Sequence, residues 1–187
     1  MASPTDSPPR EFQQILASIS RAPAHPHIAL QEVPAPSRLA PFAVAISADA
    51  EREGLEVASG RIVVGFDPEE HPAWGGTTRI IALTKAIVEP EVARDDLWAH
   101  VAWSWLEDAL APTDCHHLGG TVTKVVNEGF GSGHQSGTSV TVEMRATWSP
   151  GSTDIAPHIE AWQTLLASFA GIPPLPDGVT PLGPARA

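Results

Sequence analysis

Cysteine, lysine, asparagine and tyrosine are scarce in this chain of 187 residues, and the low counts exclude some of the bonds that it could form. The single cysteine, Cys115, has no partner for an intrachain disulfide bond. The amino-acid composition is biased, with two lysines, one asparagine and no tyrosine, as a GC-rich genome would impose. The formal net charge is −11, whereas a phosphate backbone requires a cationic surface, so we expect no nucleic-acid partner.

Long apolar segments are missing as well. No apolar run approaches the length of about 18 residues that a membrane-spanning helix needs. The first residues, Met1–Ser7, lack the basic start and the apolar core of a secretory signal peptide. We therefore expect a cytoplasmic protein without a membrane partner.

Length and composition indicate a single domain with a proper core. Hydrophobic residues make up 42% of the chain and charged residues 18%, which is typical of a globular protein. We expect residues 1–7 to be disordered, residues 8–171 to form the domain, and residues 172–187 to form a proline-rich tail. Within the domain, five prolines between residues 21 and 41 predict an extended arm along the surface.

The spacing of apolar residues predicts eight elements of secondary structure. Helical periodicity indicates helices over residues 8–20, 95–110 and 155–170, and Gly171 ends the last of them. Strands are expected at residues 42–48, 59–66, 77–88, 121–128 and 138–148, with a glycine-rich tip at 129–137 between the last two. The order α-β-β-β-α-β-β-α predicts an α+β fold, a five-stranded antiparallel sheet with helices packed on one face.

The segment from Asp95 to Leu110 carries three of the six tryptophans, and its apolar surface is unusually wide. At about 100° per residue, apolar side chains cover roughly 240° of the predicted helix, whereas a helix packed on one side needs a stripe of about 100°. Asp95 is expected to be its N-cap. Trp98 and Trp105 are assigned to the core, which leaves Trp103 without an assigned neighbour.

Trp103 has three possible surroundings. A loop or the C-terminal tail would cover it within one chain, a second subunit would cover it in a dimer, and an isolated exposed tryptophan would need no cover. The excess apolar surface favours a homodimer, and we predict a partner interface made of Trp103, Leu106 and Leu110.

Signatures of catalysis and of bound cofactors are missing from the sequence. The glycine-rich tip 129–137 lacks the Lys-Ser/Thr ending of a phosphate-binding loop and joins two strands. No Gly-x-Ser-x-Gly motif is present. The run Cys115-His116-His117 holds metal-ligand residue types, but adjacent side chains diverge and zinc requires three or four ligands. We therefore predict no catalytic residue, no metal site and no cofactor.

One polar surface keeps an enzymatic or ligand-binding alternative open. Glu143 and Arg145 alternate with apolar residues along the last predicted strand, and Thr123 lies on its hairpin partner. These three side chains form the possible ligand face. A solvated sheet surface is the simpler interpretation, and a concave pocket lined by these residues would distinguish the two.

Six short motifs give the chain a family resemblance. They are Glu32–Pro41, Trp74–Thr77, Trp103–Leu106, Gly119–Thr123, Glu160–Trp162 and Gly171–Pro176. On these motifs the chain resembles an uncharacterised actinobacterial family, the domain of unknown function three-thousand, and the resemblance implies no activity.

The predicted order of elements also resembles that of type III secretion chaperones and related small dimeric binding proteins. In that fold the middle helix contributes to a dimer interface. Together with the wide tryptophan helix and the missing catalytic signatures, this favours a non-enzymatic, chaperone-like domain. Such a domain would bind a protein or peptide and act as a homodimer.

Overall fold

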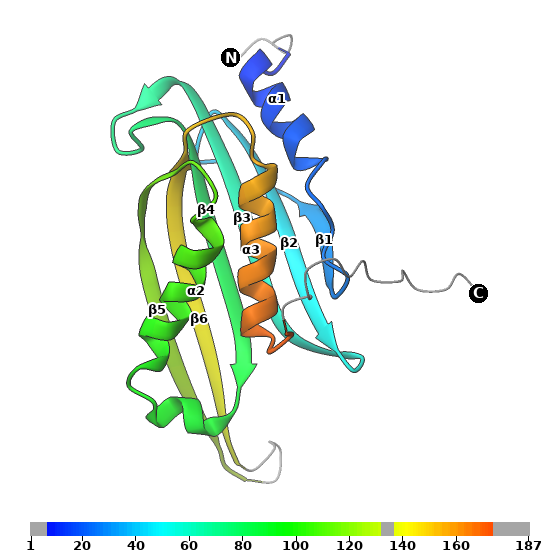
Figure 1. Ribbon diagram of the computed structural model, residues 1–187, viewed down its shortest axis with the longest axis vertical. Coiled ribbons are helices and arrows are strands. Elements are labelled where there is room, and N and C mark those ends of the chain that lie inside the picture. Colours follow the sequence, from blue (N-terminus) through cyan, green and yellow to red (C-terminus); the bar gives the residue numbers. More distant parts are fainter. Residues whose placement is uncertain (1–6, 132–136, 174–187) are drawn as a thin grey trace, which may run out of the picture.

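The computed structural model describes residues 7–131 and 137–173. Within them, six antiparallel strands form one sheet, and three helices lie on the same side of it (Figure 1). The predicted α+β class is confirmed, but the predicted number of five strands is wrong. Most of the expected disordered N-terminus, more than half of the glycine-rich tip and most of the proline-rich tail fall outside the described residues.

The elements follow the chain in a simple order. They are helix α1 (Arg10–Ile19), strands β1 (Ile28–Val33), β2 (Phe42–Arg52), β3 (Leu55–His71) and β4 (Gly76–Val88), the short 3₁₀ turn η1 (Pro90–Arg94), helix α2 (Trp98–Leu110), strands β5 (Cys115–Gly129) and β6 (Gly137–Pro150), and helix α3 (Ala156–Phe169). Their order across the sheet is β1-β2-β3-β4-β6-β5, because β6 returns to pair with β4. Strand β5 is therefore an edge strand.

Strand β1 is the element that the sequence prediction missed. It pairs with β2, from Ile28 opposite Ala50 to Val33 opposite Ala45, inside the arm that was expected to run extended along the surface. The prolines of the arm flank this segment rather than interrupt it, since none lies between Pro26 and Pro34. A strand at the edge of a sheet tolerates such flanking prolines.

Helix α3 lies over the centre of the sheet and closes the core. The alternation predicted for β6 is confirmed, because its apolar residues from Val140 to Trp148 are all buried beneath the helices. Trp162 of α3 is fully buried and packs onto Gly60, where an added Cβ would approach its ring to 2.8 Å. The Trp162 Nε1–H donates to Thr84 Oγ1 at 3.2 Å. As predicted, α3 ends before Gly171, which adopts a positive φ of 64°.

Helix α2 lies beside α3 on the same face of the sheet (Figure 1). The rings of Trp98, Trp105 and Phe169 meet edge to face, with centroids 5.6–6.1 Å apart. The helix begins at Trp98, later than predicted, and Asp95 is not its N-cap. Instead, the Asp95 carboxylate accepts a hydrogen bond from the Leu97 N–H at 2.9 Å, in a turn before the helix. No helix among the described residues has the length and apolar character required to cross a membrane.

Candidate functional site

Helix α2 uses its wide apolar surface on three sides within one chain. Leu106 and Leu110 face the sheet and are only 0% and 3% exposed. Trp98 and Trp105 turn towards α3, and Trp103 turns the other way, towards β5. Leu106 and Leu110, predicted as part of a partner interface, are therefore covered by their own chain, whereas Trp103 is half-buried.

Trp103 lies over Gly120 of strand β5. A Cβ atom at Gly120 would lie 3.0 Å from Cζ3 of the indole and 2.1 Å from the Arg145 carbonyl oxygen, so only glycine fits between helix and strand. The indole Nε1–H donates to Glu107 Oε1 at 3.0 Å, one helical turn further along α2. Strand β5 of the same chain thus covers Trp103, but only in part.

A groove with a volume of about 380 Å³ follows the open side of Trp103. Helix α2 forms one wall with Ala99, His100, Trp103 and Glu107, and β5 forms the other with Gly120, Thr121 and Val122. Because β5 is the last strand of the described sheet, one side of its backbone carries N–H and C=O groups without a strand partner. A helix-walled groove therefore runs directly beside an unpaired strand edge.

The side chain after Val122 on the helix side of β5 is Lys124, the only cation on this strand. Its Nζ donates to the carbonyl oxygens of Asp95 at 2.6 Å and Val92 at 3.4 Å, which anchor the ammonium group to the segment before α2. An ammonium group has three N–H donors, so one remains for another acceptor. The edge thus presents an apolar groove and, two residues further along, a positive charge.

The far half of β5 exposes apolar side chains on both faces. Val126 on the helix side is 49% exposed, and Val125 on the opposite side is 44% exposed. Phe130, directly after the strand, is 77% exposed, the highest value among the large hydrophobic residues described. Exposed apolar groups on both faces of an edge strand are typical of a surface that pairs with another chain.

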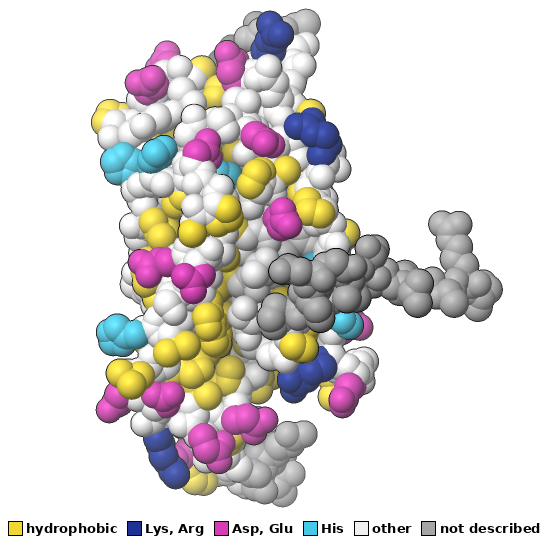
Figure 2. All heavy atoms as spheres, in the orientation of Figure 1, with side chains coloured by type: hydrophobic (Ala, Val, Ile, Leu, Met, Phe, Trp, Pro, Cys, Tyr) yellow, Lys and Arg dark blue, Asp and Glu magenta, His cyan; other side chains and the backbone are white. Residues whose placement is uncertain are grey.

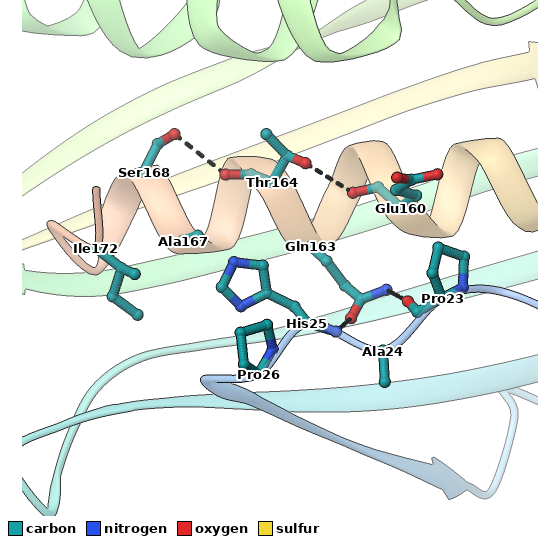
Figure 3. A pocket seen from close by; sticks show the side chains of 10 residues that line it. All are labelled: Pro23, Ala24, His25, Pro26, Glu160, Gln163, Thr164, Ala167, Ser168 and Ile172. Atoms are coloured by element: carbon teal, nitrogen blue, oxygen red, sulfur yellow. Dashed lines mark hydrogen bonds between the residues drawn. The ribbon is translucent and has the colours of Figure 1, made fainter. Parts of the chain in front are cut away.

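A second hollow, of about 540 Å³, lies between α3 and the arm at residues 23–26 (Figure 3). Gln163 of α3 is buried at its base, accepts a hydrogen bond from the His25 N–H at 2.9 Å and donates to the Pro23 carbonyl oxygen at 2.9 Å. Burial lowers the pKa of His25, and the neighbouring His27 lowers it further. Both polar ends of Gln163 are used to fasten the arm to the helix, so this hollow is a structural junction.

A chain of polar side chains runs from the core to the surface and links β6, α3 and the loop before β5. His158 is completely buried; its Nδ1 accepts a hydrogen bond from Trp148 Nε1–H at 3.1 Å, and its Nε2 lies 3.0 Å from Asp114 Oδ1. Since an indole can only donate, the imidazole proton belongs on Nε2. Burial lowers the pKa of His158, although Asp114 acts to raise it. Burial acts to raise the pKa of Asp114, but hydrogen bonds from His158 and Ser152 hold it below its ordinary value.

The polar face that was predicted as an alternative site comes together as a surface ion pair. Thr123 lies opposite Glu143 in the register, and Arg145 Nε donates to Glu143 Oε1 at 2.6 Å. The Arg145 side chain is 70% exposed on the sheet face opposite the helices. Neither the groove beside α2 nor the hollow beside α3 includes any of the three residues. An ion pair in water contributes little to stability.

The residues Cys115, His116 and His117 diverge in a bulge that begins β5. The register shifts between His116 and Gly119, and His117 adopts a positive φ of 53° with its ring against Gly75. Burial raises the pKa of the Cys115 thiol, although Arg79 acts to lower it. Across residues 7–131 and 137–173, no group of three or more His, Cys, Asp or Glu side chains is arranged to hold a metal ion.

The fold and the groove define a two-layer α+β domain in which a helix and an edge strand enclose an open channel. Residues 8–180 match the family described as Protein of unknown function (DUF3000), and the chain belongs to this family. The resemblance drawn from the six sequence motifs is thereby confirmed, and the match includes both walls of the groove. No curated protein and no solved structure matches the chain.

The groove itself was not predicted from the sequence. The Gly119-Gly120 pair was the available signal, because glycine inside a strand marks a close approach of another group to the backbone. The likeness of the topology to type III secretion chaperones and the actinobacterial origin stay predictions.

Proposed function

We propose that this protein is a non-enzymatic, cytoplasmic protein-binding domain that takes an extended segment into the groove between α2 and β5. The observation that carries the proposal is the half-buried Trp103, set over Gly120 directly beside an unpaired strand edge. An edge strand binds an extended segment through backbone hydrogen bonds, and pockets for alternate side chains add specificity. A chaperone-like role, in which the domain holds a segment of another protein, is consistent with this mode of binding.

The side chains along the helix side of β5 define what the segment should carry. Val122 and Trp103 favour an apolar or aromatic side chain in the groove, and Lys124 favours a carboxylate. Side chains two residues apart in a strand point to the same face, and Val122 and Lys124 have this spacing. In an antiparallel segment, the acidic residue therefore lies two positions before the apolar one.

The enzymatic alternative at Glu143, Arg145 and Thr123 has less support. Arg145 and Glu143 form an ion pair with each other, and the Arg145 side chain is 70% exposed. No observation at this face favours a reaction over a solvated sheet surface.

Selection of peptides from a phage-displayed library of random dodecapeptides tests the proposed function. We expect enriched peptides to carry an acidic residue two positions before an aromatic or large apolar residue. Their binding should weaken by about tenfold or more in Ala99→Phe, because a ring at this position fills the groove and removes on the order of 1.4 kcal/mol of contact energy.

Ala17→Phe is the matched control, since Ala17 is an exposed alanine on helix α1, away from the groove. This variant should bind the selected peptides as the wild type does. Equal binding of the peptides to wild type and Ala99→Phe would contradict the proposal. A library without any enriched sequence would also contradict it when the chain used for selection is monomeric and its groove is open.

A further inference from the structure

We infer that the segment bound in the groove is strand β5 of a second copy of this chain, paired antiparallel about a twofold axis at Val126. The inference rests on the proposed binding mode and identifies the segment that occupies the groove. Two copies of one edge strand pair in this way when the strand is complementary to itself in the antiparallel direction. The sequence and exposure of β5 meet that condition in one register.

The charges of β5 select the register. With Val126 of one copy opposite Val126 of the other, residues equally far before and after this position face each other. Lys124 of each copy then lies opposite Glu128 of the other, on the helix side of the joined sheet. The twofold axis produces this pair twice, and opposite charges directly across two strands attract.

Both charged groups are free to make this contact. The Lys124 ammonium group donates two of its three N–H groups to the carbonyl oxygens of Val92 and Asp95. Glu128 is exposed and accepts no hydrogen bond from the rest of the described chain. The carboxylate of one copy can therefore accept the third N–H of the ammonium group in the other.

The same register places the most exposed aromatic side chain in the groove. Phe130 is the first residue after β5. When pairing with the second copy extends the strand by one residue, alternation puts Phe130 on the side of Val126 and Glu128, and Phe130 of the second copy then lies opposite Val122. Val122 lines the groove beside Trp103, so the phenyl ring would cover the open side of the indole. Glu128-Gly129-Phe130 also has the acidic and aromatic residues at the spacing that the groove and Lys124 favour. One contact thus buries Val126, Phe130 and Trp103 together.

Sedimentation velocity of the full chain, combined with a charge swap, tests this pairing. We expect the wild type to be a dimer at micromolar concentration. Glu128→Lys places lysine opposite lysine twice, and Lys124→Glu places glutamate opposite glutamate twice. Each variant should raise the dimer Kd by about tenfold or more. When the two variants are mixed, both pairs are restored in the heterodimer, so dimers should reappear.

Two further variants complete the experiment. Glu56→Lys makes the same change of charge at an exposed position on β3 and should sediment like the wild type. Phe130→Ala removes the ring without touching Lys124 and should also weaken the dimer, which provides a test if Lys124→Glu folds poorly.

Two results would overturn the inference. One is a wild-type chain that remains monomeric, and the other is a mixture of the charge variants that associates no better than either alone. If the chain is monomeric while library peptides still bind the groove, self-pairing is wrong and the proposed function stands. If neither the chain nor any peptide occupies the groove, both are wrong.

Discussion

Replacing Gly120 with valine is expected to drive Trp103 off strand β5 and to destabilise the protein severely. The new Cβ would lie 2.1 Å from the Arg145 carbonyl oxygen, 2.9 Å from Ala146 Cα and 3.0 Å from the Trp103 ring. Two of these neighbours are backbone atoms, which cannot rotate away. We expect a loss of about 4 kcal/mol in the free energy of unfolding, at the upper end for a single substitution. Urea unfolding followed by tryptophan fluorescence measures this loss.

Gly119→Val provides the control for that measurement. Gly119 is the adjacent residue of the same strand, and a Cβ there would meet no atom within 4 Å. This variant should unfold within about 1 kcal/mol of the wild type, because β-branched residues suit a partly exposed strand position with space for the side chain. If the two glycine variants were equally stable, Trp103 and the backbone of β6 would not approach Gly120 as described.

Acidification is expected to destabilise the fold through His158. In the folded protein Nδ1 accepts the Trp148 N–H, so a proton added there would face another proton and break the link. Burial lowers the pKa of His158 below 6.5, its value in an unfolded chain. Between these two pKa values, His158 is protonated in the unfolded state and neutral in the folded state. The stabilisation is complete above pH 6.5 and is lost as pH falls through the lowered pKa. Asp114 adds a loss of the same sign at more acidic pH.

The free energy of unfolding, measured by urea denaturation between pH 8 and pH 5, checks this expectation. His158→Gln retains a polar group at the position but does not titrate, so its stability should depend less on pH over this range. His100→Gln, at an exposed position of α2, should keep the full dependence of the wild type. A wild-type stability that is constant down to pH 5 would show that His158 is not held neutral.

Removing the indole donor gives an independent check on the same link. Trp148→Phe leaves Nδ1 of His158 buried without a donor, which costs about 1–3 kcal/mol at neutral pH. The freed nitrogen can then take a proton beside Asp114, so the pKa of His158 should rise. An NMR titration of the His158 ring in this variant measures the shift.

The regular elements could be predicted because their patterns are local. Strand β6 alternates without interruption and lies between two other strands, so its buried and exposed residues follow directly from the sequence. Helix α3 has a single apolar stripe and ends before a glycine with positive φ. In both elements, one periodicity and one boundary signal determine the structure.

The arm and the ends of the strands depend on partners that lie far away in the chain. Strand β1 has few residues and is surrounded by prolines, and only its pairing with β2 makes it a strand. Strand β2 continues to Arg52 because Glu53 and Gly54 alone form the turn, both with positive φ. Glutamate is an uncommon residue in such a turn, so the sequence predicted a longer loop.

The sequence predicted a wide apolar surface on the tryptophan helix, but it did not show which neighbours cover that surface. Periodicity describes one helix by itself and does not show which surfaces approach it. Helix α3 covers Trp98 and Trp105, the sheet covers Leu106 and Leu110, and β5 covers one side of Trp103. Apolar side chains still gather on the surface between α2 and α3, with acidic groups around them (Figure 2). The surface left open on Trp103 itself is the wall of the groove.

The NMR resonance of the Trp103 indole N–H offers the most direct test of binding in that groove. It is identified by its loss in Trp103→Phe. The probe is a synthetic decapeptide with the sequence of residues 121–130, added to the Phe130→Ala variant, whose own pairing is weakened so that the groove is open. We predict that the peptide shifts this resonance and slows hydrogen exchange along β5. A peptide with lysine in place of the glutamate should have a much weaker effect. An unchanged Trp103 resonance, or shifts centred on Gln163 and the arm at Pro23, would contradict the proposed site.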